Sequence, residues 1–125
     1  MRKVMLLIAA AVTAVLFAGC ASSQVAKPAQ LNGANLNNET TVAHINAENW
    51  GLYFFMIPLI TGSTENPGEM VFFEDTVRTE NVVKMVTKMS KEMGATQTLN
   101  LISRHNSFVW WFGIRDVQVS ANAVR

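Results

Sequence analysis

The stretch TENVVKMVTKMSKEMG, residues 79–94, decides the fold because it is the clearest secondary-structure element in the chain. Its apolar residues recur at spacings of three and four, which places them on one face of a helix. Thr79 is the expected N-cap and Gly94 stands where a C′ glycine belongs. The pattern predicts an amphipathic helix that packs one face on a sheet. That face holds Val82, Met85, Val86, Met89 and Met93, whereas Lys84, Thr87, Lys88 and Lys91 lie elsewhere.

The segment before this helix is strongly apolar. Residues Trp50–Ile60 carry apolar side chains at both odd and even positions. This pattern predicts a strand that is covered on both faces or that faces a partner. Thr61–Gly68 is rich in turn-forming residues and is expected to be a loop. Met70–Phe73 is then expected to add a short strand.

The segment after the helix changes to a period of two. Thr98–Leu101 alternates, Arg104–Ser107 is predicted to turn, and Phe108–Phe112 is predicted to return, so a hairpin is expected. Ile114–Val124 predicts a half-buried strand. Its inward set is Val117, Val119, Ala121 and Ala123, and its outward set is Gln118, Ser120 and Asn122.

This order of elements predicts an α+β fold, with a small, mostly antiparallel sheet and one amphipathic helix packed on one face. We expect the domain to span residues 49–125. A single domain is all that a chain of 125 residues allows.

The N-terminus has the three-part layout of an export signal, which we expect to occupy residues 1–19. Met1–Lys3 is positive, Val4–Ala18 is an apolar run of 15 residues, and Ala18-Gly19 is a small pair. A spanning helix needs about 20 apolar residues, so the segment is expected to be cleaved and not retained as a membrane span.

Two cleavage positions are compatible with this signal. An ordinary signal peptidase could use a small-x-small triplet such as Gly19-Cys20-Ala21, but cleavage immediately before Cys20 fits better. Leu16, Phe17, Ala18 and Gly19 before Cys20 resemble the bacterial lipobox, with Phe17 where that family most often has Leu. Cys20 is also the lone cysteine, so it cannot form an internal disulfide.

The lipobox resemblance implies a bacterial lipoprotein. It implies a diacylglycerol thioether on Cys20 and usually a further acyl chain, such as palmitate, on its amine. Two or three chains would hold the protein in the membrane of the cell envelope. Ala21 and Ser22 follow where an Asp would signal inner-membrane retention in enteric bacteria, so the analogy implies the outer membrane, on its periplasmic or surface face.

The residues that follow have the composition of a linker. Residues 20–48 combine Cys20 with a stretch rich in Ala, Ser, Gln and Asn, and we expect a flexible tether that holds the domain roughly 25 to 30 Å from the bilayer. The layout from lipobox through one helix to closing strands distantly resembles small surface lipoproteins of the Bor and TRL-like kinds. That resemblance concerns architecture alone and implies no functional residue.

Charge and motif content argue against several function classes. Without Arg2 and Lys3, the chain keeps 8 basic and 9 acidic residues, a net charge of −1, so no nucleic-acid partner is expected. His44 and His105 have no ligand at a metal-binding spacing, and no metal or other cofactor is expected. The methionines at 85, 89 and 93 could suggest a Cu(I) site, but valines share their face and core packing is the stronger interpretation.

No catalytic group is expected. The chain lacks a nucleophile motif and a glycine-rich phosphate loop. The adjacent carboxylates Glu74 and Asp75 should point apart or begin the helical region. We therefore do not expect an enzyme.

Aromatic residues are more numerous than a small core needs. Five consecutive residues from 108 to 112 on a strand place alternate rings on opposite faces, so one set is either exposed or covered by further structure. The candidate interface is Trp110, Trp111 and Phe112. The leading hypothesis is an interaction or structural module of the envelope that docks onto itself or onto another envelope component. The alternative is a binder of a small, lipid-like ligand held between helix and sheet.

Overall fold

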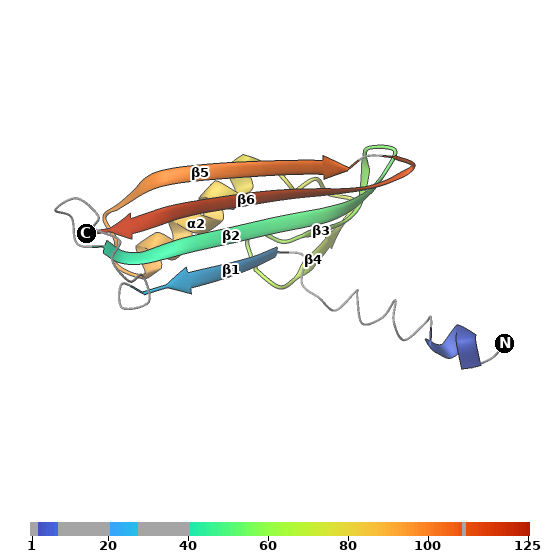
Figure 1. The fold of residues 1–125 in the computed structure, drawn as a ribbon, viewed down its shortest axis with the longest axis horizontal. Coiled ribbons are helices and arrows are strands. Elements are labelled where there is room, and N and C mark those ends of the chain that lie inside the picture. The colour runs from blue at the N-terminus through green and yellow to red at the C-terminus, as the bar shows by residue number, and fades with distance from the viewer. Residues whose placement is uncertain (1–2, 8–20, 28–40, 109) are drawn as a thin grey trace.

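The computed structural model describes residues 3–7, 21–27, 41–108 and 110–125, and this described part contains a six-stranded antiparallel sheet with a helix across one face (Figure 1). The strand order is β4-β3-β2-β6-β5, and β1 also pairs with β2. Residues 3–7 form a further short helical stretch. The α+β prediction is confirmed in its coarse form, although strands dominate. The elements are β1 (Ala21–Ala26), β2 (Thr41–Phe54), β3 (Ile57–Gly62), β4 (Met70–Phe72), α2 (Thr79–Glu92), β5 (Gln97–Phe108) and β6 (Phe112–Val124).

Strand β2 organises the sheet. One of its edges pairs with β6 along almost its whole length, from Thr41 opposite Val124 to Phe54 opposite Phe112. Its other edge is shared by two strands, since β1 pairs with residues 44–49 and β3 with residues 51–54. The strands β4 and β5 therefore end the strand order, and β1, which pairs with β2 alone among the described strands, is an outer strand as well.

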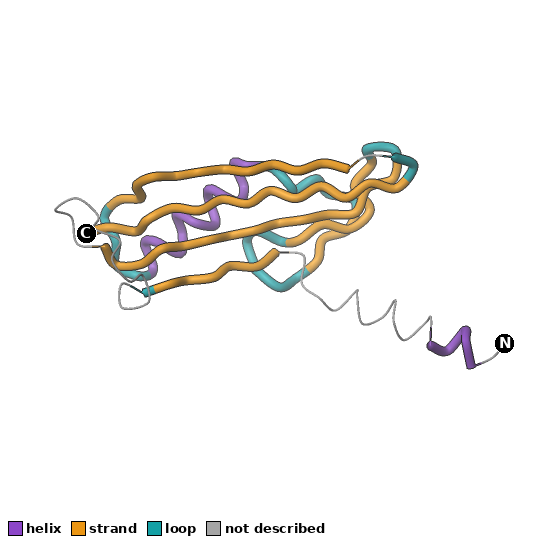
Figure 2. The backbone as a smooth tube through the Cα atoms, viewed as in Figure 1, coloured by secondary structure: helices purple, strands orange, loops and turns teal. Residues whose placement is uncertain are grey.

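The core lies between the sheet and α2, which crosses behind the strands in Figure 2. Side chains alternate along a strand, so one parity of β2 and of β6 faces the helix. In β6, the inward set predicted from the sequence is buried as expected. Many of the inward residues are small, which allows the helix to approach the sheet closely. They are Ala43, Ile45, Ala47, Asn49, Gly51 and Tyr53 from β2, and Val117, Val119, Ala121 and Ala123 from β6.

Helix α2 presents the predicted face. Val82, Met85 and Val86 are buried, and Met89 and Met93 pack against the core while half-buried. Their place in the core agrees with the packing interpretation of these methionines.

The two ends of α2 differ in how well they were predicted. The N-cap is Arg78 and not Thr79, and no side chain caps the first turn. The Arg78 carbonyl instead accepts bonds from the N–H groups of Asn81 and Val82. At the other end, Gly94 has a φ of +76° and its N–H bonds to the carbonyl of Lys91, as a C′ glycine should.

The segment predicted as one strand over Trp50–Ile60 is two strands joined by a tight turn. β2 ends at Phe54, β3 begins at Ile57, and the two turn residues both have positive φ, 48° for Phe55 and 76° for Met56. Such a turn favours Asn and Gly, but Phe and Met occupy the two positions here, so the local sequence does not predict a turn. The prediction of a single strand was therefore wrong.

The hairpin after α2 exists, but its turn was misplaced. Residues Arg104–Ser107, predicted to turn, lie inside β5, and the chain reverses between Phe108 and Phe112. Each of these four residues has a partner on β6, from Arg104 opposite Gln118 to Ser107 opposite Arg115. Extending this ladder satisfies more backbone groups than an early turn would.

The expected tether is also different where it is described. Ala21–Ala26 forms β1, and residues 41–48 are the first part of β2, so the expected boundary at residue 49 falls inside a strand. β1 pairs residue by residue with β2, from Ala21 opposite Asn49 to Ala26 opposite His44. This ladder satisfies backbone groups along an edge of β2 that would otherwise be open. Residues 28–40 lie outside the described residues.

Candidate functional site: an exposed aromatic surface

Two hairpin ends lie side by side at one end of the sheet (Figure 1). One is the turn between β2 and β3, and the other is the reversal between β5 and β6. The N–H of Phe55 donates a hydrogen bond of 3.2 Å to the carbonyl oxygen of Trp111, which ties the two ends together. Ring contacts join them as well, because the centroids of Phe54 and Phe112 are 5.1 Å apart and those of Phe55 and Trp111 are 5.2 Å apart.

The predicted interface residues belong to this end and are exposed. The solvent-accessible fraction is 72% for Trp110, 60% for Trp111 and 59% for Phe112. They belong to a larger set of exposed apolar residues, which we call the aromatic surface. Its ten members are Phe54, Phe55, Met56, Ile57, Phe72, Phe108, Trp110, Trp111, Phe112 and Ile114.

The sheet register explains how this surface extends beyond the turns. Residues directly opposite one another in an antiparallel pair share a face. Leu52 is opposite both Ile114 and Ile60, so an apolar row crosses five of the six strands on the face away from α2. In strand order the row is Phe108, Ile114, Leu52, Ile60 and Phe72.

The aromatic surface gives way to polar side chains over two rows of the sheet. Neither Asn49–Thr64 nor His105–Ile114 contains an Asp, Glu, Lys or Arg. One row further from the turns, Asn106 and Asp116 face one another, and the Asn106 amide donates to the carboxylate over 3.3 Å. The half-buried Trp50 lies opposite Asp116 in the same row, so this row mixes polar and aromatic side chains. The row beyond that is polar across the sheet and consists of Arg104, Gln118, Glu48 and Ser22.

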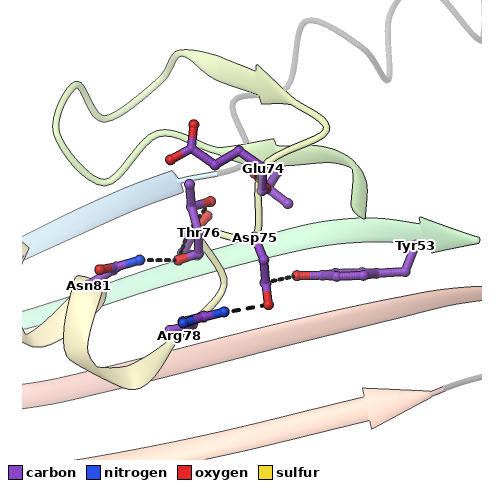
Figure 3. A network of polar contacts seen from close by, with 8 residues as sticks. Tyr53, Glu74, Asp75, Thr76, Arg78 and Asn81 are labelled. Carbon is purple, nitrogen blue, oxygen red and sulfur yellow. Dashed lines mark hydrogen bonds and ion pairs between the residues drawn. The ribbon is translucent and has the colours of Figure 1, made fainter. Parts of the chain in front are cut away.

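A polar network lies behind the same end of the sheet, on the helix side (Figure 3). The Tyr53 hydroxyl donates to Asp75 Oδ1 over 2.6 Å, and Arg78 Nε lies 3.5 Å from Asp75 Oδ2. The guanidinium of Arg115 stacks 4.6 Å from the centre of the Tyr53 ring. Burial, and then the hydrogen bond to Asp75, raise the pKa of Tyr53 well above its usual value. Tyr53 therefore stays protonated and acts as a hydrogen-bond donor.

A second set of bonds in this network holds Thr76. Its hydroxyl donates to the Gly62 carbonyl over 2.6 Å. Its carbonyl accepts from the side-chain amides of Asn49 and Asn81, over 3.1 and 3.2 Å. These bonds fix the connector between β4 and α2 against the sheet. We interpret the network as structural, since most of its groups bond to one another. Among the described residues, the buried Asn49 Oδ1 has no hydrogen-bond partner. Glu74 and Asp75 precede the helix and do not begin it, and Glu74 contributes its carbonyl, which accepts from Thr61.

The other residues considered from the sequence are dispersed. His44 lies in β2, where Nδ1 is 2.7 Å from Asn122 Oδ1, whereas His105 is exposed in β5. No group of three His, Cys, Asp or Glu side chains within the described ranges is placed to hold a metal. Cys20 and the four lipobox residues before it lie outside the described residues. No helix in the described segments is long and apolar enough to cross a membrane.

Sequence reasoning missed much of the aromatic surface. Met56, Ile57 and Phe72 were not singled out, although all three are exposed. A usable signal was the length of the uncharged run Asn49–Thr64, because its 16 residues far exceed the average strand of about 5 or 6 and favour a turn within the run.

Comparisons with protein-family models, with curated proteins and with solved structures found no match. The structure itself defines the class of protein, an antiparallel sheet with a helix on one face and an exposed aromatic surface at one end.

Proposed function

We propose that this chain is an envelope lipoprotein, held by lipid on Cys20, that works as an interaction module and docks onto an apolar partner through the aromatic surface. The observation that carries the proposal is the aromatic surface itself. Uncharged exposed patches of this kind on a soluble domain mark sites of contact with a partner.

The fold does not need this surface for its own stability. The core between α2 and the sheet is complete without it, since Tyr53, Val82, Val86 and Val117 are fully or almost fully buried. Rings that stay largely exposed lower solubility, and their exposed apolar area contributes no burial energy until a partner covers it. A contact with a partner is the explanation that accounts for their number and for their position on neighbouring turns.

The lipid anchor is supported by the lipobox resemblance of Leu16 to Cys20. The outer membrane is the proposed location, because Ala21 and Ser22 replace the retention signal. No catalytic role is proposed, and no cofactor. The alternative function, binding of a lipid-like ligand between helix and sheet, has less support because core side chains fill that space. A hollow beside α2 is lined by Met85 together with polar and charged residues that include Glu65, Asn66, Asn81, Lys84 and Lys88.

The anchor is tested by metabolic labelling with a fatty acid analogue. The wild-type chain should take up the label at Cys20, and Cys20→Ser should not. Equal labelling of both chains, or none of the wild type, would show that the anchor has been misread.

The docking surface is tested by photo-crosslinking in intact cells. A photoreactive phenylalanine at position 111 should crosslink to another molecule, whereas the same residue at position 118, in the polar part of the same sheet face, should not. Equal yields at the two positions would contradict docking through the aromatic surface.

A further inference from the structure

We infer that the partner of the aromatic surface is the lipid bilayer, so that the domain contacts the same membrane that holds Cys20. This inference rests on the proposed function and identifies its partner. It depends on where the chain enters the sheet, on the arrangement of polar and apolar rows, and on the shape of the surface.

The chain enters the sheet close to the aromatic surface. Cys20 is bonded directly to Ala21, the first residue of β1, and Ala21 lies opposite Asn49 in β2. Asn49 is five residues before Phe54, which at about 3.4 Å per residue corresponds to about 17 Å along the strand. A lipid on Cys20 would therefore begin within about 20 Å of the aromatic surface. The expected tether would have separated the domain from the bilayer, but β1 begins immediately after the anchor.

The order of side chains along the sheet suits the interface of a bilayer. The turns and the rows next to them are apolar and include Trp110 and Trp111. The boundary row contains Asn106, Asp116 and Trp50, and the row beyond it is polar. Tryptophan is enriched where a protein passes from hydrocarbon to water, because its ring is apolar and its N–H can still bond.

The surface also has the shape of an inserting element. It is built from two adjacent hairpin ends at the extremity of the domain (Figure 1), so it projects outward. A lipid anchor and an apolar contact on one domain reinforce each other, since the anchor keeps the apolar surface beside the membrane.

The test uses the lipidated protein extracted from membranes and reconstituted into vesicles that contain bromine-labelled phospholipid. Bromine in the acyl chains quenches tryptophan only at short range. A Trp50→Phe variant retains just Trp110 and Trp111, because the chain has three tryptophans. We expect this variant to lose most of its fluorescence in the brominated vesicles relative to unlabelled ones.

The matched control moves the probe to the polar part of the same face. In a chain with Trp50, Trp110 and Trp111 changed to Phe, Arg104→Trp places a single tryptophan on β5, two rows beyond Phe108. This probe should keep its fluorescence in brominated vesicles. Arg104, Trp110 and Trp111 are exposed, and Trp50 is half-buried and lies outside the core, so the substitutions leave the core intact. Near-ultraviolet circular dichroism verifies folding.

The outcomes separate the two proposals. Acyl chains on Cys20 by mass spectrometry, with unquenched Trp110 and Trp111, would overturn the membrane contact and leave the anchor standing. Unquenched but blue-shifted emission would point to a second copy or another protein on the surface, and would equally overturn it. Quenching in a chain without acyl groups would support the contact and contradict the anchor.

Discussion

The hydroxyl of Tyr53 donates a 2.6 Å hydrogen bond to Oδ1 of Asp75 and so joins the inner face of β2 to the connector before α2. Tyr53 is 1% exposed, and its neighbour Phe54 belongs to the aromatic surface. The bond thus fixes the strand immediately behind that surface. The backbone that carries the exposed ring of Phe54 is therefore held against the connector by this bond.

Tyr53→Phe should destabilise the protein at neutral pH by about 1–2 kcal/mol, because it removes a hydrogen bond to a charged acceptor that is partly open to water. Urea unfolding of the two proteins measures the difference. Phe keeps the ring and its contact with Arg115, so the loss reports the hydroxyl. An unchanged unfolding midpoint would show that the bond contributes nothing.

Stability should also depend on alkaline pH through Tyr53. In the unfolded chain the tyrosine has a pKa near 10, and in the folded protein burial and Asp75 raise that pKa. The contribution of protonated Tyr53 to the free energy of unfolding is therefore fully present below about pH 10, and it is lost as the pH rises above that value. The free energy of unfolding, measured at several pH values across this range, should change less for Tyr53→Phe than for the wild type, because the variant has no phenol to ionise. Because Tyr53 is the lone tyrosine, tyrosinate absorbance should appear together with unfolding.

Met85→Ala should cost about 2–5 kcal/mol, because the thioether side chain is buried between α2 and the sheet and its removal leaves a cavity. The neighbouring exposed Lys84→Ala is the matched control and should stay within about 0.5 kcal/mol of wild type. Thermal unfolding of both variants provides the comparison. A wild-type melting temperature for Met85→Ala would mean that this face of the helix is not packed.

The sequence predicted those elements whose side-chain period is strong. The three- and four-residue spacing in α2 and the alternation from Val117 to Ala123 each report a buried face directly. Gly94 was identifiable because its backbone conformation excludes most other residues.

The elements that were missed depend on contacts between distant segments. β1 lacks a marked apolar alternation and exists through its pairing with β2. The ladder with β6 similarly overrides the turn preference of Arg104–Ser107. The candidate site was predicted in part: Trp110, Trp111 and Phe112 were named, but their neighbourhood with Phe54 and Phe55 follows only from the register of β2 and β6.

Gly51→Ala should destabilise the protein by about 1–3 kcal/mol through overpacking. A Cβ at this position would lie 2.7 Å from Thr61 Cγ2 and 3.0 Å from both Ile60 O and Val77 Cγ2. The double variant Gly51→Ala/Thr61→Ser should recover part of the loss, since Ser lacks the methyl group and keeps the hydroxyl that bonds to Glu74. Strict additivity of the two single changes in urea unfolding would argue against this close approach.

Met56→Gly should stabilise the fold, by about 0.5–1 kcal/mol, although it removes a large apolar side chain. Met56 has a φ of 76° and is 65% exposed, so its backbone is strained while its side chain contributes little to the core. Glycine relieves the strain but gives back part of the gain through its freer unfolded chain. Met56→Ala is the control, because it removes the same side chain and keeps the Cβ, and it should not be more stable than wild type.

If the aromatic surface is a contact site, both variants should weaken membrane contact equally, and only the glycine variant should unfold at higher urea. Equal stability of the two variants would show that the turn is not strained at Met56. The large apolar side chain at this position would then cost the fold nothing, and no role in membrane contact would be needed to explain it.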